Sequence, residues 1–198
     1  MKVFGLDRNL LLGRSPLLPQ KATLTHLLMR PDSSVINSGK HIYLPPHLTD
    51  MRAFPVIAFR LDRVGKFVDP AFASRYIKEI SVGIALFDRK GVLQSLLEGL
   101  DPSPFCGFDG ALILDHFSAL SQIPDRGWGF VAGEESRDFS LPPATLAYSY
   151  VVLLSQYFML KMGDLIIIPL LEETFGVVQE DNIYVSLAGN EIAYVGIR

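Results

Sequence analysis

The chain has 198 residues, of which 49% are hydrophobic and 20% charged, and its formal net charge at pH 7 is −3. This length and apolar content predict one domain over residues 1–198, with a sizeable core and, in part, an apolar surface for self-association. A weakly acidic chain gives no electrostatic reason to expect nucleic acid or an anionic membrane as a partner, so we expect neither.

Targeting and redox signals point to an intracellular protein. Charged residues at Asp7, Arg8 and Arg14 interrupt the leucines near the start, which is not the pattern of a signal peptide. Polar and charged residues also interrupt the most apolar window, residues 148–171, so it lacks the roughly 20 apolar residues of a membrane helix. Cys106 is the only cysteine, which excludes an internal disulfide. We therefore expect a cytoplasmic protein.

In chain order, the apolar patterns predict a series of short strands separated by turns. The predicted strands are residues 1–6, 23–29, 41–48, 54–61, 80–87, 111–114, 128–132 and 165–168, and then a terminal hairpin of 182–185 with 191–197. The predicted helices are residues 70–77, 92–100 and 146–160. Many short strands and few helices indicate a mostly β domain of the α+β kind, closer to a rolled or sandwiched sheet than to a doubly wound one.

The clearest local signal lies between residues 144 and 178, where a helical period gives way to a buried strand. Apolar residues recur at spacings of three and four up to Leu160, which predicts an amphipathic helix. Gly163 and Asp164 then mark a turn, because glycine readily takes the left-handed conformation found at helix ends. The continuously apolar residues 165–168 predict a strand that is covered on both faces.

Reactive side chains form no convincing catalytic group in the sequence. His41 and His47 lie six residues apart around two prolines, a spacing that imposes no shared face. Asp115 and His116 are adjacent, and consecutive strand residues point to opposite faces, so we expect no dyad there. Cys106 has no basic sequence neighbour that would lower its pKa, so we expect an inert thiol. Residue chemistry alone predicts no enzyme.

Several stretches resemble, in sequence and spacing, the fumarylacetoacetate hydrolase superfamily. They are MKVFGLDRN, RPDSSVINSGKHIYLPPHL, RLDRVGK, RYIKEISVGIALFDR, GFDG and YVVLLSQYFMLKMGDLIII. The resemblance covers nearly the whole chain and implies the family's mixed β-sandwich roll with a few short helices. It also implies chemistry on small keto-enol acids, which family members hydrolyse, isomerise, hydrate or decarboxylate on a divalent metal.

The resemblance also implies where a metal would be held. In the family, a Glu-x-Glu pair on one strand and an aspartate on another bind magnesium, manganese or calcium, and alternate strand residues share a face. The Glu-x-Glu positions fall on Phe54 and Val56, or one residue later on Pro55 and Ile57, and the aspartate position falls on Ala85. Neither register supplies a carboxylate, so we predict no metal and no other cofactor.

Other family positions have changed as well. The Asn-Tyr-x-x-His pattern keeps Asn9 but has Leu10 and Gly13, so the general-base histidine is absent. Cys106 replaces the lysine before Gly-Phe-Asp-Gly, and residues 168–171, Ile-Pro-Leu-Leu, replace the Thr-Gly-Thr-Pro loop that helps to bind substrate.

Four residues remain as expected remnants of the substrate pocket: Asn9, Arg30, Arg89 and Asp109. We predict no catalytic residue, and hence a catalytically degenerate family member, or pseudoenzyme, acting as a non-catalytic binding or partner subunit. Its partner would be a second copy in a homodimer or a related active subunit. One alternative is an active hydrolase, isomerase or decarboxylase with relocated site residues that uses magnesium or manganese. Another is a module that binds a small carboxylate on the surviving arginines.

Overall fold

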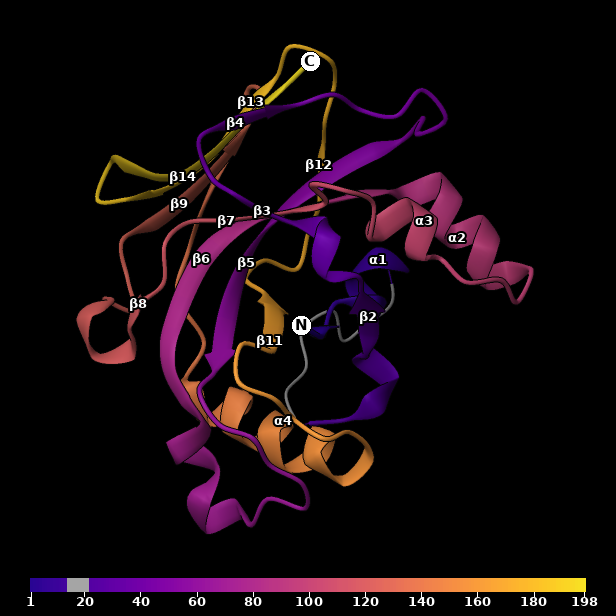
Figure 1. The fold of residues 1–198 in the computed structure, drawn as a ribbon. Helices are drawn as coiled ribbons and strands as arrows, with labels where there is room; N and C mark the ends of the chain where they lie inside the picture. Colours follow the sequence, from indigo (N-terminus) through magenta and orange to yellow (C-terminus); the bar gives the residue numbers. More distant parts are fainter. Residues whose placement is uncertain (14–21) are drawn as a thin grey trace.

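The computed structural model describes residues 1–13 and 22–198 (Figure 1). Its helices are α1 (Arg8–Leu11), α2 (Arg89–Leu97), α3 (Ser103–Cys106) and α4 (Ala144–Tyr157), with 3₁₀ helices η1 (Leu24–His26), η2 (Asp32–Ser34), η3 (Pro70–Tyr76) and η4 (Leu120–Gln122). Its strands are β1 (Val3–Gly5), β2 (Leu28–Arg30), β3 (Val35–Asn37), β4 (Lys40–Ile42), β5 (Met51–Leu61), β6 (Ile77–Asp88), β7 (Leu112–Leu114), β8 (Ser118–Ala119), β9 (Trp128–Ala132), β10 (Glu135–Phe139), β11 (Leu165–Pro169), β12 (Phe175–Gly176), β13 (Asn182–Leu187) and β14 (Asn190–Ile197). Within these described ranges, every helix is too short or too polar to cross a membrane.

The strands form two curled sheets that face each other across the larger core (Figure 1). The first sheet has the order β2-β1-β11-β5-β6-β7-β3, with β12 also beside β5 and β8 beside β6. The second has the order β10-β9-β13-β14-β4 and includes the predicted terminal hairpin. Parallel and antiparallel neighbours occur in both sheets. The predicted mostly β architecture is confirmed.

Strands β5 and β6 are the longest and pair antiparallel in the middle of the first sheet, from Met51 opposite Asp88 to Leu61 opposite Ile77. Most of their residues are buried, because apolar side chains occupy both faces of each strand. The strands predicted at residues 54–61 and 80–87 are thus confirmed, and both extend further. The β5–β6 pair therefore contains all the positions that the resemblance implies for the family's metal ligands, four of them on β5 and Ala85 on β6.

Buried apolar residues form two clusters on opposite faces of the first sheet. Ala53 and Ile57 of β5 belong to the larger cluster, which lies between the two sheets. Phe54 and Val56, which alternate with them, belong to the smaller cluster together with side chains from α1, α2 and α3. Since consecutive strand residues point to opposite faces, the short helices cover the face that carries Phe54 and Val56.

The predicted succession of helix, turn and buried strand is present as α4, a turn and β11. The helix ends at Tyr157, three residues before the predicted end, because Phe158 has an extended backbone. Leu160 instead forms an isolated antiparallel bridge with Gly65. The buried Asp164 orders the turn, since its carboxylate accepts a hydrogen bond from the backbone N–H of Lys2 at 2.8 Å and one from that of Lys161 at 2.9 Å.

Two predicted strands are only partly present. Of residues 41–48, only His41 and Ile42 lie in a strand, at the end of β4, which stops before Pro45. Residues 23–29 form η1 and the beginning of β2 in place of one strand, because the Thr23 hydroxyl accepts a hydrogen bond from the N–H of Thr25 and starts the 3₁₀ turn. Asp115 and His116 do contact each other, with 2.9 Å between Oδ2 and Nδ1. They lie after the end of β7, so the alternation of a strand does not separate them. The His116 side chain is largely exposed, and the pair lies on the surface.

Candidate functional site

The residues at the implied metal positions meet on one face of the β5–β6 pair. Phe54 and Ala85 are direct cross-strand partners, and Val56 follows on the same face of β5. All three are fully buried in the smaller apolar cluster. The ring of Phe54 also packs edge-on against that of Phe87, with 5.8 Å between the ring centroids. The structure therefore brings the implied ligand positions together, but the side chains at these positions are apolar.

These positions do not fit a divalent cation. Magnesium, manganese and calcium are held by several oxygen ligands, and Phe54, Val56 and Ala85 offer none from their side chains. The other register fails too, because Ile57 points into the opposite core and Pro55 has no side-chain oxygen. Among residues 1–13 and 22–198, no three His, Cys, Asp or Glu side chains are grouped closely enough to hold a metal.

Cys106, which the resemblance places at the family lysine, lies in the same apolar cluster. Burial is the main cause that raises the pKa of its thiol to about 12, although the nearby Arg30 charge acts in the opposite direction. Its Sγ–H points to the carbonyl oxygen of Pro102, 3.5 Å away. This buried apolar environment is the one expected for an inert thiol.

We predict that Cys106 in the folded protein will not react with a thiol-specific aromatic disulfide reagent at pH 8, because both burial and the raised pKa keep the thiolate scarce. Reactivity should remain low up to about pH 10 and become complete when the protein is unfolded in guanidinium chloride. The measurement is the release of the coloured thiolate over time. Stoichiometric release from the native protein at pH 8 would contradict this account.

A pocket of about 520 Å³ lies beside the apolar cluster, between α1 and the start of α2, and we call it the α1 pocket. Its walls include Leu10 and Gly13, the two positions at which the resemblance implies a family tyrosine and histidine. The other described residues that line it are Leu11, Leu12, Asp50, Phe87, Arg89, Lys90, Leu93 and Thr174. Because it combines several predicted family positions with charged side chains, the α1 pocket is the best candidate for a functional site.

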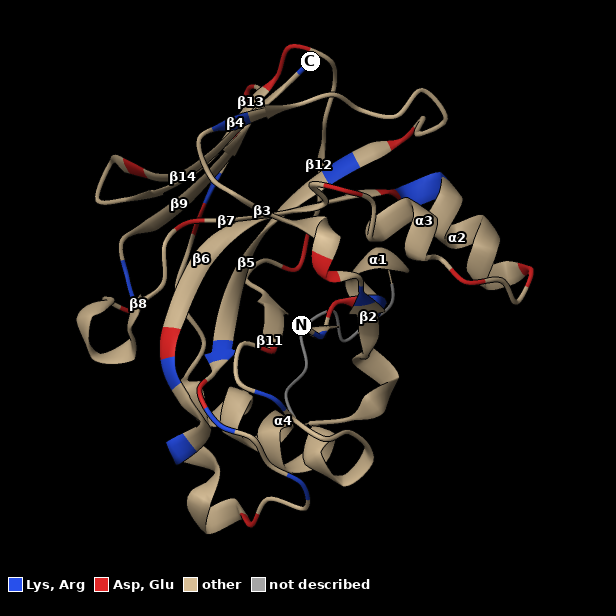
Figure 2. Ribbon diagram, viewed as in Figure 1, with Lys and Arg blue, Asp and Glu red and all other residues tan. Residues whose placement is uncertain are grey.

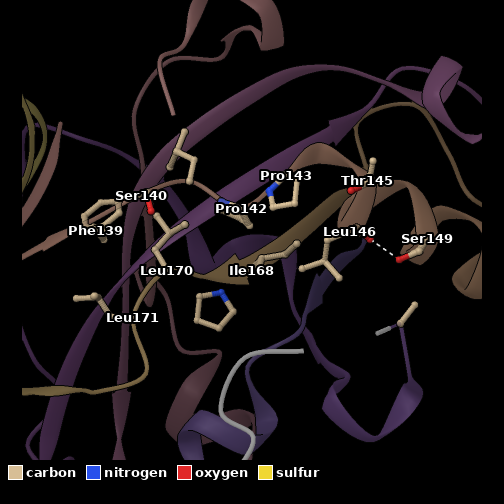
Figure 3. Close-up of a pocket in the computed structure, with 13 residues that line it drawn as sticks. Phe139, Ser140, Pro142, Pro143, Thr145, Leu146, Ser149, Ile168, Leu170 and Leu171 are labelled. Carbon is tan, nitrogen blue, oxygen red and sulfur yellow. Dashed lines mark hydrogen bonds between the residues drawn. The ribbon is translucent and has the colours of Figure 1, made fainter. Parts of the chain in front are cut away.

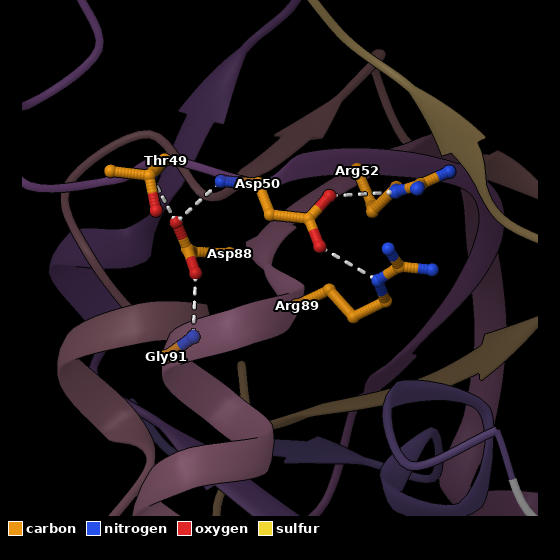
Figure 4. A network of polar contacts seen from close by, with 6 residues as sticks. All are labelled: Thr49, Asp50, Arg52, Asp88, Arg89 and Gly91. Carbon is orange, nitrogen blue, oxygen red and sulfur yellow. Dashed lines mark hydrogen bonds and ion pairs between the residues drawn. The ribbon is translucent and has the colours of Figure 1, made fainter.

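A network of charges borders the α1 pocket (Figure 4). The Asp50 carboxylate lies between two guanidinium groups, 2.7 Å from Arg89 Nε and 3.2 Å from Arg52 Nε. Burial raises the pKa of Asp50, but hydrogen bonds and positive charge from Arg89 and Arg52 outweigh burial, so its pKa lies below the ordinary value. Asp50 therefore stays ionised at neutral pH, and the two arginines have a fixed anionic partner.

Asp88, which ends β6 three residues after the implied metal position Ala85, has a structural role in this network. Its side chain caps the N-terminus of α2 by accepting a hydrogen bond from Gly91 N–H at 2.6 Å. It also accepts hydrogen bonds from the backbone N–H groups of Thr49 and Asp50 (Figure 4). These donors occupy both carboxylate oxygens, so Asp88 belongs to the scaffold that fixes the start of α2 and of β5.

The four predicted pocket remnants do not converge. Arg89 lines the α1 pocket. Arg30 is buried elsewhere, with its Nη2 2.5 Å from Asp7 and its Nε donating to the Cys106 carbonyl at 2.7 Å. Asp109 is exposed in the loop after α3, and Asn9 is partly buried in α1. Only Arg89 is thus placed with the charged side chains of the candidate site.

Sequence reasoning missed Asp50, Arg52 and Lys90. Asp50 and Arg52 precede and begin β5 at alternate positions, a spacing that puts two side chains on one face and could have suggested a pair. Their relation to Arg89 depends on the β5–β6 pairing across 39 residues, which the sequence does not display.

A larger cavity of about 950 Å³ lies at the start of α4 and the end of β11 (Figure 3). It includes residues 168–171, which the resemblance aligns with the family's Thr-Gly-Thr-Pro loop. Among the described residues that line it, none is charged. The Ser149 hydroxyl donates to the Leu146 carbonyl of its own helix at 2.6 Å (Figure 3). This cavity therefore offers no charged group to an anionic substrate, in contrast to the α1 pocket.

Comparison of the fold with solved structures gives clear matches. No model of a known protein family matches the sequence, and no curated protein is significantly similar to it. The fumarylpyruvate hydrolase from Pseudomonas aeruginosa, solved in complex with Mn²⁺ and pyruvate, matches with a TM-score of 0.79, 15% identity, and coverage of 99% of this chain and 88% of the hydrolase. A protein described as a fumarylacetoacetate hydrolase family member, from Yersinia pestis CO92, matches with a TM-score of 0.77, 15% identity, and coverage of 100% and 92%.

The chain has the fumarylacetoacetate hydrolase fold. A further structure with this fold, the 5-carboxymethyl-2-hydroxymuconate delta-isomerase from Mycobacterium smegmatis, has a TM-score of 0.74, 16% identity, and coverage of 99% of this chain and 78% of the isomerase. At these identities the likeness establishes the fold, and the fold expected from the sequence resemblance is confirmed. Because one fold carries different chemistries, the function must be argued from the site.

Proposed function

We propose that this protein is a member of the fumarylacetoacetate hydrolase family that has lost the family's metal-dependent chemistry and acts as a non-catalytic binding or partner subunit. The observation that carries the proposal is the fully buried apolar group Phe54, Val56 and Ala85 at the implied ligand positions. Carboxylates introduced there would be enclosed by the smaller cluster, whereas the present side chains contribute to its packing.

The ligand proposed for this subunit is a small carboxylate in the α1 pocket. Arg89 and Lys90 supply two positive charges against one negative charge from Asp50, so the lining favours an anion. Among the described residues, Arg89 pairs with Asp50 through Nε, which leaves the terminal guanidinium nitrogens as donors for a planar carboxylate. A volume of about 520 Å³ suits a small acid.

The alternative is an active hydrolase, isomerase or decarboxylase with relocated residues that recruits magnesium or manganese. The matched enzymes favour it, since one of them was solved with Mn²⁺ and pyruvate in the same fold. In this chain the α1 pocket would have to supply the ligands, and Asp50 is its one carboxylate among the described lining residues. Because Asp50 is already paired with two arginines, we prefer the non-catalytic function.

Metal content and thermal melts separate the two functions. We expect purified protein to carry no stoichiometric magnesium or manganese, and its melting temperature to stay constant when either metal is titrated. Pyruvate, used as the probe carboxylate, should raise the melting temperature of the wild type as binding to the folded state requires. At about 100 times the dissociation constant, the rise should be roughly 5–10 °C.

The matched variants are Arg89→Met, which should abolish the pyruvate effect, and Arg126→Met, an exposed arginine outside the α1 pocket, which should preserve it. A stoichiometric metal, or a melting temperature that rises with manganese, would overturn the non-catalytic function and lead to a screen of keto-enol acids. An undiminished pyruvate effect in Arg89→Met would overturn the assignment of the ligand to the α1 pocket.

A further inference from the structure

The uncharged cavity at the start of α4, which we call the α4 cavity, has no role in the proposed function (Figure 3). Its volume of about 950 Å³ exceeds that of the α1 pocket and lies within the usual range for small-molecule sites, about 300–1,000 Å³. One wall comes from residues 139–146, which lead into α4. The other comes from the end of β11 and the two residues after it. Two segments that are separate in the chain therefore enclose the α4 cavity.

Charged groups are missing from the described lining of the α4 cavity and from the two elements behind it. Helix α4 and strand β11 contain no Lys, Arg, Asp or Glu, and both are tan in Figure 2. An ionised ligand would lose hydration on entering, and no charged side chain among the described lining residues would compensate for that loss. The lining therefore disfavours charged molecules, in contrast to the α1 pocket.

The backbone around the α4 cavity offers few hydrogen-bond donors. The N–H of Leu141 already donates to the Asp125 carbonyl at 2.8 Å. The N–H of Leu170 donates to the Pro55 carbonyl at 3.0 Å. Proline has no N–H, and three further lining residues are prolines: Pro142, Pro143 and Pro169. Apolar side chains and satisfied backbone groups thus make up most of the lining.

The walls of the α4 cavity are held in place by the fold. Proline fixes φ at about −65°, and φ of Pro143 is −63°, so the wall before α4 has little conformational freedom. On the other side, Ile168 and Pro169 belong to the ladder between β11 and β5. A cavity with such walls is formed before a ligand arrives, so binding requires little ordering of the protein.

Two hydroxyl groups are the polar side-chain atoms that remain available to a ligand. The hydroxyls of Ser140 and Thr145 bond to no other described residue. The third hydroxyl of the lining, that of Ser149, already donates to the Leu146 carbonyl at 2.6 Å (Figure 3). A free hydroxyl can donate to a carbonyl oxygen or exchange hydrogen bonds with an alcohol. The matching ligand is therefore apolar over most of its surface and carries a single uncharged oxygen group.

We propose that the α4 cavity binds an uncharged apolar molecule that carries one hydroxyl or carbonyl group. Burial of its apolar surface against Leu146, Ile168 and Leu170 drives the binding. Ile168 and Leu170 belong to the larger apolar cluster, on the opposite face of the first sheet from Phe54 and Val56. The inference thus goes beyond the proposed function and depends neither on the implied metal positions nor on a carboxylate in the α1 pocket.

Fluorescence titration with prodan, an uncharged naphthalene ketone that emits at shorter wavelength in apolar surroundings, tests the inference. We expect saturable binding of one probe per chain. 1-Octanol should displace the probe, and octanoate at pH 8 should require at least about a ten-fold higher concentration, since the two differ chiefly in charge. Saturating pyruvate should leave the probe bound. Lack of saturable binding, displacement by pyruvate, or equal displacement by octanoate would each overturn the inference.

Two variants locate the probe, one on each wall. Leu146→Asp places a carboxylate in the first turn of α4, where the helix dipole favours an acidic residue. Leu171→Asp places one in the loop after β11, so the test does not depend on a single variant remaining folded. Each should raise the prodan dissociation constant at least about ten-fold.

The control for both variants is Leu97→Asp, which introduces the same charge at an 85% exposed leucine of α2 and should leave prodan binding unchanged. Circular dichroism confirms that each variant is folded before it is titrated. Unchanged affinity in a folded Leu146→Asp or Leu171→Asp protein would overturn the assignment of the probe to the α4 cavity. Failure of the proposed function would appear in the metal and pyruvate melts and would leave the prodan result as it is.

Discussion

Replacing Phe54 with alanine is expected to lower the free energy of unfolding by about 3–5 kcal/mol, the usual cost of removing a large side chain from a close-packed core. Phe54 is fully buried, lies opposite Ala85 and contacts the Phe87 ring. The surrounding β5–β6 backbone is fixed by a continuous ladder and cannot collapse into the cavity. Urea denaturation followed by circular dichroism measures the change, with an unaltered m value showing that the native state is retained.

The control for Phe54→Ala is Leu97→Ala, an equally apolar truncation at an exposed position of α2. It should change stability by less than about 0.5 kcal/mol. A similarly small effect at Phe54 would mean that the space beside Ala85 is adaptable, as in a binding site. The interpretation of Phe54 as a packing residue that has replaced a ligand would then be wrong.

Replacing Arg30 with methionine is expected to destabilise the protein by about 3–5 kcal/mol, because it leaves the Asp7 charge buried without its partner. Both side chains have no exposed surface, and Arg30 Nη2 lies 2.5 Å from Asp7 Oδ2. Burial lowers the pKa of Arg30, but the charge and hydrogen bond of Asp7 and the interaction with Cys106 outweigh it and raise that pKa above its ordinary value. Urea denaturation again gives the measurement.

A second replacement tests the reason for this loss. In the double variant Arg30→Met with Asp7→Leu, no buried charge remains, and most of the lost stability should return. The Arg30 and Asp7 side chains pack directly against Gly5, where an added Cβ would lie 2.3 Å from Arg30 Nη1 and 2.8 Å from Asp7 Oδ1. Gly5 is therefore kept unchanged in the double variant. If the double variant were as unstable as Arg30→Met alone, the penalty would come from lost packing and not from the unpaired carboxylate.

The fate of Arg30 shows why family resemblance predicted the fold better than the pocket. A resemblance places a residue in a strand or loop, and Arg30 is indeed the last residue of β2. Which way its side chain extends depends on its neighbours, and here the absence of a side chain at Gly5 lets it reach Asp7 and the Cys106 carbonyl. A basic residue expected at a pocket margin is therefore a buried structural cation.

For the candidate site, the sequence predicted only which of the family's carboxylates are missing. Phe54, Val56 and Ala85 could be identified from sequence as positions without carboxylates, and the structure brings them to one face as the resemblance implied. The charged network was not predictable, because Asp50 and Arg89 are 39 residues apart and meet only when β5 and β6 pair. The large cavity at the start of α4 likewise combines segments that are separate in the chain.

The sequence by itself determined the elements whose signal is local: the buried strands β5, β6 and β11, the helix α4, and the turn at Gly163 and Asp164. Side-chain period and turn chemistry act over a few residues, so these features can be read without knowing what packs against them. Tertiary structure alone decided that β1 lies beside β11, that Arg30 pairs with Asp7, and which apolar side chains remain exposed. These outcomes depend on contacts between distant segments, whose burial and charge become defined only when the two sheets close around the core.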